Sequence, residues 1–417
     1  MVRLPGRGGV PIARFDLVPI ASPLHDAAAL ETIVGRYRHV VDALGGRLVD
    51  ALDPSGPPAL LFVLTGGTEH RILETWDRTL RRGRFVTLVA HPDQNALPAA
   101  LEALARIHQL GGRGRIVYLP DLDRAGPLLD EAVRDLTVDA RLRGTRIGLV
   151  GEPSDWLVAS NPDPAVVRRV WGPEVVPIGL ERLYARFSPD AASAADLVSA
   201  AAASDRSLGE IDRAGGIYDA LRALIDEERL DAVSLRCFDL ISVLDTTGCV
   251  ALSELNDEGL TAGCEGDVVS TIGLLWARLL LDALGWMANP ARIDVDASRI
   301  LLAHCTVPRK LVTSYRLESH FESDRGVGID GTIPPGPVTL LRIGGEELDR
   351  LWLAQGTIVP TDRSAGLCRT QMTVEVTARD ALHRVLDAPL GNHMVAVAGH
   401  HAERLGAWWR RFVAPID

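Results

Sequence analysis

Short apolar runs alternate with longer amphipathic segments through the first third of the chain. The pattern predicts buried strands at residues 15–21, 59–65, 85–90 and 115–119, and helices at 27–44, 97–110 and 127–142. Short apolar runs indicate buried strands, and apolar residues repeated at helical spacing indicate amphipathic helices. Regular alternation of strand and helix favours a parallel, doubly wound sheet with helices on both faces.

A second set of such units begins near residue 145. Residues 145–150 predict a strand that runs into Gly-Glu-Pro-Ser-Asp-Trp, and residues 207–228 predict an amphipathic helix. A strand at 231–237 would bring Asp239 to its far end. Ligands bind beyond the carboxyl ends of parallel strands, so Ser154 and Trp156 are candidates to line a pocket. The alternative is a proline-containing turn with a buried tryptophan. The Ala/Ser-rich segment 191–204 continues a helical pattern.

The pattern changes after residue 289, where short β-rich runs replace the strand–helix alternation. Strands are predicted at 299–304, 313–320, 338–343, 369–376 and 394–398, with a closing helix at 401–412. Proline- and glycine-rich turns separate them. The chain is therefore predicted to be α/β, with one parallel-sheet domain at 1–144, a second at 145–290 and a smaller β-rich domain at 291–417.

Composition and charge narrow the classes of function. The chain has 417 residues, 47% hydrophobic and 24% charged, which is typical of a globular protein. Its formal net charge of -11 argues against nucleic acid as the main partner, because phosphate binding needs a basic surface. The most apolar run contains Arg278 and Asp282 and is too short for a bilayer, so no membrane span is predicted. Five scattered cysteines and an N-terminus without an apolar signal segment predict a cytoplasmic protein.

Two carboxylates two residues apart form the most distinctive polar motif. Glu265 and Asp267 lie beside two glycines, directly before an apolar helical run at 272–284. At the end of an extended strand such residues point to the same side and could converge on one cation or one substrate. The alternative is a solvated acidic helix N-terminus, where carboxylates are favoured. Asp294 and Asp296 repeat the spacing and are interpreted as the cap of a turn.

Histidines gather in the C-terminal part of the chain, at predicted strand ends or in loops. They are His304, His320, His393, His400 and His401. Carboxylates from one domain and an imidazole from another would suit Mn²⁺ or a related divalent ion. A structural role is the alternative for each histidine alone. Arg369 could bind an anionic or hydroxyl-rich substrate, or be structural.

Several short motifs occur in a recognisable order. They are Gly-Gly-Thr-Glu at 66–69, Gly-Glu-Pro-Ser-Asp-Trp at 151–156, Cys-Phe-Asp at 237–239, Cys-Glu-Gly-Asp at 264–267, His-Cys-Thr-Val-Pro at 304–308 and Gly-Asn-His at 391–393. With these motifs the chain resembles the L-fucose isomerase/L-arabinose isomerase superfamily, in particular its short fucose isomerase-like branch. The resemblance covers most of the chain, and Cys-Glu-Gly-Asp and His-Cys are its more specific parts.

The resemblance implies two Rossmann-like domains and a β-rich C-terminal domain, assembled as a homo-oligomer (a trimer or hexamer) with active sites at subunit interfaces. It also implies Mn²⁺ held by two carboxylates and a histidine, with Glu265 or Asp267 as one carboxylate and His393 as the imidazole. The second carboxylate is left open. Upstream it would be Asp239 or Asp245; downstream it would lie near Asp294, with a further histidine near His304.

We therefore predict a divalent-metal-dependent aldose–ketose isomerase that converts an open-chain sugar or deoxysugar through a cis-enediol. Glu265 is the predicted base, Asp267 or Asp239 its partner, and His393 a metal ligand. The predicted substrate contacts are Ser154, Trp156, His304, His320 and Arg369. One alternative is a metal-dependent epimerase, lyase or aldol-type enzyme on an unusual sugar in specialised metabolism. The other is a non-catalytic sugar-binding protein.

Overall fold

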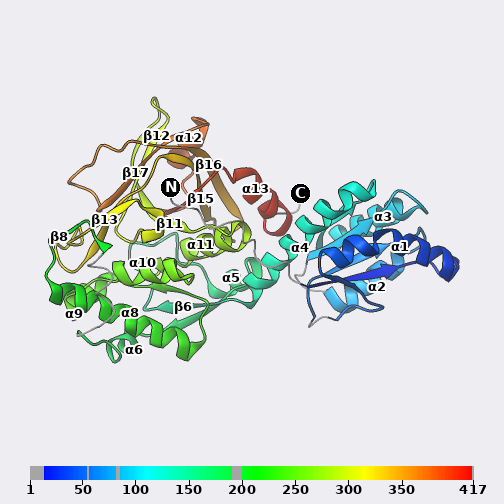
Figure 1. Ribbon diagram of the computed structural model, residues 1–417, viewed down its shortest axis with the longest axis horizontal. Helices are drawn as coiled ribbons and strands as arrows, with labels where there is room; N and C mark the ends of the chain where they lie inside the picture. Colours follow the sequence, from blue (N-terminus) through cyan, green and yellow to red (C-terminus); the bar gives the residue numbers. More distant parts are fainter. Residues whose placement is uncertain (1–13, 54–55, 81–84, 190–199, 416–417) are drawn as a thin grey trace. The chain divides into compact units, whose positions relative to one another are not determined.

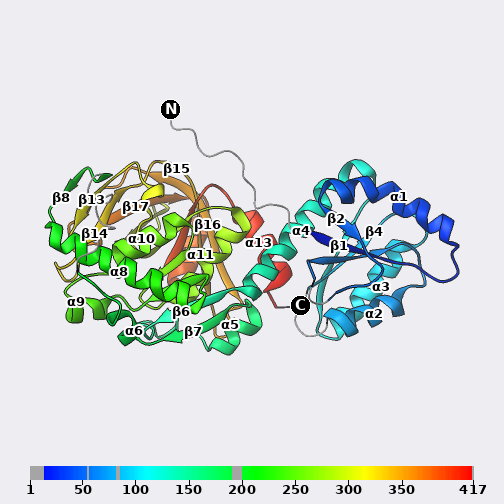
Figure 2. The same cartoon turned by 60° about the horizontal axis from the view of Figure 1, so that its bottom comes forward.

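The computed structural model describes residues 14–53, 56–80, 85–189 and 200–415. The chain separates into two compact units. Unit 1 comprises the residues up to 141 together with those from 408, and unit 2 comprises residues 142–407 (Figures 1 and 2). Residues 1–13 and most of the predicted helical segment 191–204 lie outside the described residues. None of the helices in the described ranges is long and apolar enough to cross a bilayer.

Unit 1 contains a five-stranded parallel sheet in the order β2-β1-β3-β4-β5. Its strands are β1 (Phe15–Ile20), β2 (Gly46–Leu48), β3 (Ala59–Val63), β4 (Phe85–Ala90) and β5 (Arg113–Tyr118). Its helices are α1 (Ala27–Ala43), α2 (Glu69–Thr75) with the π-helical turn η1 (Trp76–Leu80), α3 (Ala96–Gln109) and the start of α4 (Leu122–Gly144). The sequence predicted four of the strands and the parallel arrangement.

Strand β3 shows why the sheet has helices on both faces. Its residues are apolar throughout, so both faces must be covered. Leu61 and Val63 pack in one core cluster with Ile107 of α3. Phe62 points the other way and meets the edge of Tyr37 on α1, with ring centroids 5.4 Å apart. Figure 2 shows α1 on one side of the sheet and α2 and α3 on the other.

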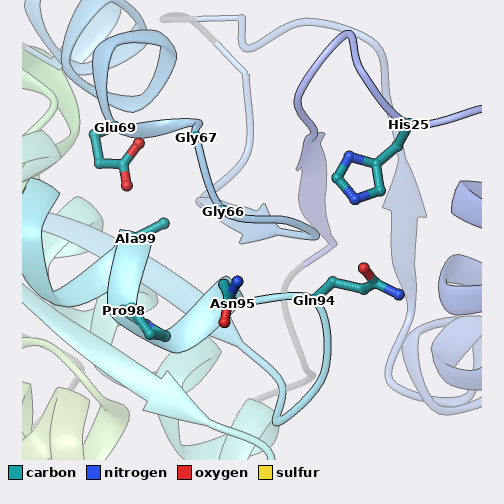
Figure 3. A pocket seen from close by; sticks show the side chains of 8 residues that line it. All are labelled: His25, Gly66, Gly67, Glu69, Gln94, Asn95, Pro98 and Ala99. Atoms are coloured by element: carbon teal, nitrogen blue, oxygen red, sulfur yellow. The ribbon is translucent and has the colours of Figure 1, made fainter.

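A cavity of about 380 Å³ opens at the carboxyl ends of β3 and β4 in unit 1 (Figure 3). It is lined by His25, Gly66, Gly67, Glu69, Gln94, Asn95, Pro98 and Ala99. Gly67, Gln94 and Asn95 all have left-handed backbone, with φ of 71°, 58° and 57°. The Gly-Gly motif therefore serves a tight turn beside a second left-handed turn.

Unit 2 begins with a second parallel sheet in the order β10-β9-β6-β7. Its strands are β6 (Arg146–Val150), β7 (Glu174–Ile178), β9 (Ala232–Leu235) and β10 (Thr261–Cys264). Its helices are α5 (Pro164–Val170), α6 (Leu180–Tyr184), α8 (Leu208–Glu228), α9 (Phe238–Leu244), α10 (Cys249–Glu258) and α11 (Val268–Leu281). Ser207 and Glu210 form a capping box that fixes the start of α8.

The remainder of unit 2 is a closed antiparallel barrel in the order β11-β12-β17-β16-β15-β18. Its strands are β11 (Gly285–Asp294), β12 (Arg299–His304), β15 (Gly336–Gly344), β16 (Arg350–Val359), β17 (Thr370–Val376) and β18 (Met394–Ala398). A small sheet pairs β8 (Ala203–Ser204), β13 (Ser314–Glu318) and β14 (Gly328–Thr332), and η3 (Arg309–Leu311), α12 (Asp380–Asp387) and α13 (Ala402–Phe412) complete the described elements. The core of the barrel comes from every second residue of these strands, as the pleat requires.

Helices α10 and α11 lie between the second sheet and the β structure that follows it. On α11, Leu341 and Val395 of the barrel approach Gly273 so closely that an added Cβ would lie 3.2 and 3.3 Å from them. On α10, the Ser253 hydroxyl donates to the Val307 carbonyl at 2.7 Å. Through these contacts, strand ends of the parallel sheet and of the barrel lie close together. The polar motifs are at these strand ends.

The prediction of an α/β chain with parallel sheets and a C-terminal β-rich part is confirmed. The sequence did not predict β11, β16 or α10. Residues 256–258 have the polar composition of a turn but form the end of α10, and Gly259 caps the helix at φ 108°. The domain boundaries at 144/145 and 290/291 stay a prediction, and the two parts of unit 2 form one compact unit.

Candidate functional site

The Cys-Glu-Gly-Asp motif turns sharply where β10 ends. Glu265 has a left-handed backbone with φ 62°, and Gly266 follows with φ 71°. The Ser154 N–H donates to the Glu265 carbonyl at 2.9 Å. A Cβ on Gly266 would lie 2.7 Å from the Cα of Pro153, so only glycine fits beneath this loop. The turn directs Glu265 into the site and leaves Asp267 as the N-cap of α11.

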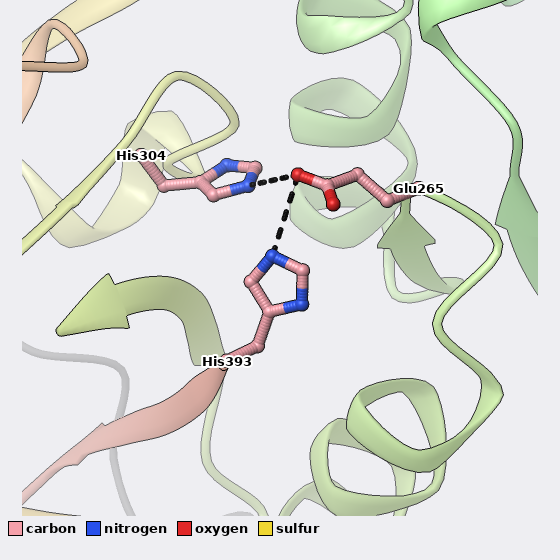
Figure 4. Close-up of side chains that lie close together, drawn as sticks. All are labelled: Glu265, His304 and His393. Atoms are coloured by element: carbon pink, nitrogen blue, oxygen red, sulfur yellow. Dashed lines mark ion pairs between the residues drawn. The ribbon is translucent and has the colours of Figure 1, made fainter. Parts of the chain in front are cut away.

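Glu265, His304 and His393 form a buried cluster of possible metal ligands (Figure 4). His304 is the last residue of β12, and His393 directly precedes β18. The ligand atoms of the three side chains lie within 4.8 Å of one another. Glu265 Oε1 lies 3.4 Å from His393 Nε2 and 3.8 Å from His304 Nε2. Their exposures of 6%, 5% and 0% for Glu265, His304 and His393 place the cluster in the interior.

Each imidazole is oriented by a group on its other nitrogen. Asp267 Oδ2 lies 2.9 Å from His393 Nδ1, and Thr306 Oγ1 lies 2.9 Å from His304 Nδ1. Because a carboxylate can only accept, the His393 Nδ1–H must donate to Asp267, which directs Nε2 at Glu265. This Nε2 is buried and has no hydrogen-bond partner among the described residues. A carboxylate that orients a histidine in this way is the usual outer partner of a metal-bound imidazole.

Asp267 is held from behind by a buried arginine. Its Oδ1 accepts from the Ser270 N–H at 2.7 Å, and its Oδ2 accepts from the Ser270 hydroxyl at 2.8 Å. Arg342 Nη1 donates to the same Oδ2 at 3.2 Å, and the guanidinium also donates to Ser160 Oγ and to the Leu390 carbonyl. Arg342 is 3% exposed and Asp267 is 0% exposed. A buried ion pair of this kind is tolerated because hydrogen bonds satisfy both partners.

The charges of the cluster shift the pKa values of its members. Burial alone would raise the pKa of Glu265, but the adjacent His304 and His393 hold it well below its usual range. Burial would likewise raise the pKa of Asp267, but the charge of Arg342 and the bond to His393 lower it. For His393, burial favours the neutral form, yet Asp267 and Glu265 raise the pKa to about 9. These carboxylates favour a second proton on His393, and a divalent cation bound at the cluster would replace that proton.

A cavity of about 480 Å³ adjoins the cluster through Glu265. It is lined by Trp156, Phe238, Glu265, Asn289, Glu322 and Asn392. The Trp156 indole N–H donates to Glu265 Oε2 at 2.5 Å, and its ring meets the edge of Phe238 at 4.9 Å. Trp156 is 49% exposed, so it lines a cavity and is not the buried tryptophan of the alternative interpretation. The two oxygens of Glu265 thus face different partners, histidines on one side and the cavity wall on the other.

Other predicted site residues lie outside the three-residue cluster. Asp239 is in α9 and accepts from Arg236 Nε at 3.0 Å through both oxygens. The His320 ring meets the edge of Phe238 at 5.3 Å, and its Nδ1 lies 3.2 Å from Ser323 Oγ.

Four further candidates make contacts within the local structure. Arg369 donates to the Ser319 carbonyl and hydroxyl at 2.7 and 2.8 Å. Asp245 pairs with Arg325 at 3.2 Å, and Asp294 caps the turn at the Ala297 N–H, as expected. Ser154 is buried, and it positions Glu265 through its backbone.

Arg342 and Ser270 were not predicted from the sequence as site residues. Arg342 lies in the otherwise apolar segment 338–343, and an arginine on a buried strand needs a buried anion. The sequence therefore indicated that Arg342 has a buried carboxylate partner, but it did not identify Asp267 as that partner.

Comparisons with known proteins relate the chain to sugar isomerases. No protein-family model matches it. It is 22% identical over 283 residues to a sulfoquinovose isomerase from Alkalicoccus urumqiensis, which covers 64% of this chain and 62% of that protein. It is 23% identical over 188 residues to sulfoquinovose isomerases from Priestia aryabhattai and Priestia megaterium, covering 43% of this chain and 42% of theirs. The chain therefore spans less than two thirds of the length of each of these relatives.

Proposed function

We propose that the chain is a divalent-metal-dependent aldose–ketose isomerase of an open-chain sugar. The observation that carries the proposal is the buried cluster of Glu265, His304 and His393 beside a polar cavity. The similarity to sulfoquinovose isomerases, at 22–23% identity, supports the class of reaction. Membership of the fucose/arabinose isomerase superfamily belongs to the same proposal.

Glu265, His304 and His393 would hold the metal, and the orphaned Nε2 of His393 fits this role. One carboxylate oxygen and two imidazoles suit Mn²⁺ or a related ion, and three protein ligands leave positions for substrate oxygens. When bound, such an ion polarises the sugar carbonyl and stabilises negative charge on its oxygen.

The protein's own side chains divide the remaining work. Glu265 is the proposed base: it takes the proton from C2 and returns it to C1 on the same face of the cis-enediol, while the hydroxyl proton of O2 passes to O1. The Trp156 indole N–H orients the carboxylate that does this. Asp267 is fully buried behind His393, so we assign it to positioning the imidazole rather than to proton transfer.

Metal content tests the proposal directly. We would measure divalent ions in the purified protein and after Mn²⁺ loading, for wild type, Glu265→Gln and His393→Ala. His383→Ala replaces an exposed histidine on α12 and is the matched control. We expect close to one ion per chain in wild type and the control, and a loss of at least about 100-fold in affinity for both site variants. A wild-type protein that takes up no divalent ion would overturn the proposal.

Product analysis separates the isomerase from its chemical neighbours. Epimerases, lyases and aldol-type enzymes also begin from a stabilised enediolate, so metal binding alone does not distinguish them. In D₂O we expect an aldose to give its ketose with deuterium at C1, seen by NMR, to the extent that the base exchanges its proton with solvent. A product inverted at C2, or cleaved, would favour the alternative. The homo-oligomer, a trimer or hexamer, is part of the same proposal and is checked by analytical ultracentrifugation.

A further inference from the structure

The cavity beside the metal cluster has an uneven distribution of charge. Its six lining residues supply two carboxylates, two amides and two aromatic rings, and none is cationic. Glu265 is turned toward His304 and His393, so its charge is already engaged. Glu322, an exposed residue between β13 and β14, has no ion pair or hydrogen bond within the described residues. It is therefore the uncompensated charge of the cavity wall.

Arginines near the lining residues are committed to other groups. Arg236, two positions before Phe238, donates to Asp239, to Asp155 and to the Pro153 carbonyl. Its charge is thus shared by two carboxylates. Arg236 is therefore not a free guanidinium for an anionic substrate.

The arginines near Glu322 are engaged in the same way. Arg369 donates to both oxygens of Ser319 and lies 3.7 Å from Glu318. Arg325, three positions after Glu322, pairs with Asp245 at 3.2 Å. Within the described residues, both of these guanidinium groups therefore have partners other than Glu322.

We propose that this cavity accepts a sugar that is neutral or carries an ammonium group away from its carbonyl, and disfavours a sulfonated sugar, with Glu322 as the residue that decides. The inference rests on the proposed isomerase function. It sets this chain apart from relatives whose name specifies sulfoquinovose. An ammonium group would pair with the Glu322 carboxylate, whereas a sulfonate would meet it as a like charge and would have to remain hydrated or move aside.

The size of the effect follows from the exposure of Glu322. An exposed pair of opposite charges is worth up to about fivefold in affinity, and like charges cost a similar factor. The preference for an ammonium over a sulfonate at one position should therefore reach up to about 25-fold. Salt screens exposed charges, so the preference should shrink as ionic strength rises.

Three sugars with one scaffold make the test: 6-deoxyglucose, 6-amino-6-deoxyglucose and sulfoquinovose, which carries a sulfonate at C6 of the same skeleton. We would measure kcat/KM for each with the Mn²⁺-loaded protein at low and high salt, and binding constants by calorimetry in parallel. For wild type we expect the order amino, then neutral, then sulfonate. Glu322→Gln should bring the three values together, and Glu322→Lys should reverse their order.

Glu346→Gln is the control, because Glu346 is an exposed glutamate in the turn between β15 and β16 that does not line the cavity. It changes the net charge equally and should leave the order intact. Sulfoquinovose as the best wild-type substrate, or an order unchanged by Glu322→Gln, would overturn the inference. If no sugar is isomerised, the proposed function fails, and the calorimetric order of the three sugars still decides the charge preference.

Discussion

Replacing Asp267 by Asn tests how the site is built, because it removes one charge and almost no volume. The carboxylate accepts four hydrogen bonds: from the Ser270 N–H and hydroxyl, from Arg342 and from His393 Nδ1. An amide has one accepting oxygen and one donating NH₂ group. If the oxygen faces the Ser270 N–H, the NH₂ faces Arg342 and His393. If it is flipped, the NH₂ opposes the Ser270 N–H. Either orientation leaves one donor facing another.

The first orientation changes the tautomer of His393. With an NH₂ group beside it, Nδ1 must accept, and the proton moves to Nε2, the nitrogen that faces Glu265. A protonated Nε2 cannot bind a metal. Loss of an outer carboxylate typically weakens metal affinity 10- to 100-fold, which is about 1.4–2.7 kcal/mol. We expect the loss of metal affinity in Asp267→Asn to lie near the upper end of this range. His393 Nε2 has no hydrogen-bond partner among the described residues, so the bond at Nδ1 alone fixes the tautomer.

The same substitution should lower folding stability. Arg342 would stay buried without its anion, and breaking a buried pair costs about 3–5 kcal/mol. Arg342 keeps its bonds to Ser160 Oγ and the Leu390 carbonyl, so we expect the lower end of that range. The double variant Asp267→Asn/Arg342→Met removes both charges. It should recover part of the stability but none of the metal affinity.

The assay is a Mn²⁺ titration of the folded variants by calorimetry, with urea denaturation of the metal-free proteins in parallel. Asp239→Asn is the control: it removes a carboxylate from the same unit, but one that pairs with Arg236 outside the ligand cluster. It should bind Mn²⁺ as wild type does. The reasoning is refuted if folded Asp267→Asn binds Mn²⁺ within twofold of wild type, or if Asp239→Asn weakens binding equally.

Other substitutions test the backbone and the electrostatics. Gly266→Ala should destabilise by at least about 1–3 kcal/mol, because φ is 71° and the new Cβ would lie 2.7 Å from Pro153 Cα; a wild-type urea midpoint would contradict this. Gly35→Ala, in open space on α1, should instead stabilise by about 0.5–1 kcal/mol, checked by the same denaturation. Burial and the bond to Glu258 raise the pKa of Tyr218 to about 12. The contribution of Tyr218 to folding stability should be full below pH 10 and be lost as the pH rises through 12, so ultraviolet titration should show a phenolate forming near pH 12 that Tyr218→Phe removes.

Much of the fold could be predicted because its strands are buried on both faces or alternate cleanly. The run at 85–90 is apolar except for Thr87, and the structure has β4 with the same bounds. Strand β16 was missed although its inward residues alternate, because Gln355 and Gly356 interrupt the apolar pattern. Helix α10 was missed because the polar run at 256–258 resembles a turn, and only the closing Gly259 has a turn conformation.

The sequence predicted that Glu265 and Asp267 converge on one group, but the directions of their side chains could not be predicted from their spacing. An extended backbone would have pointed Glu265 and Asp267 to one side. The left-handed φ of Glu265 instead sends them to the two nitrogens of one imidazole. That conformation follows from the loop packed on Gly266, which belongs to a strand end more than a hundred positions earlier in the chain. Local sequence carries no sign of it.

The buried charges of the site explain why its parts depend on one another. Glu265, Asp267 and Arg342 are all in the interior, and each would be costly alone. Arg342 neutralises Asp267, and Asp267 fixes the proton on His393 Nδ1. Glu265 has no arginine or lysine partner among the described residues, and the Nε2 atoms of His304 and His393 face it. A divalent ion at this point would balance the last charge. Arg342 on β15 therefore supports the proposed metal centre through Asp267, although it contacts none of the three proposed ligands.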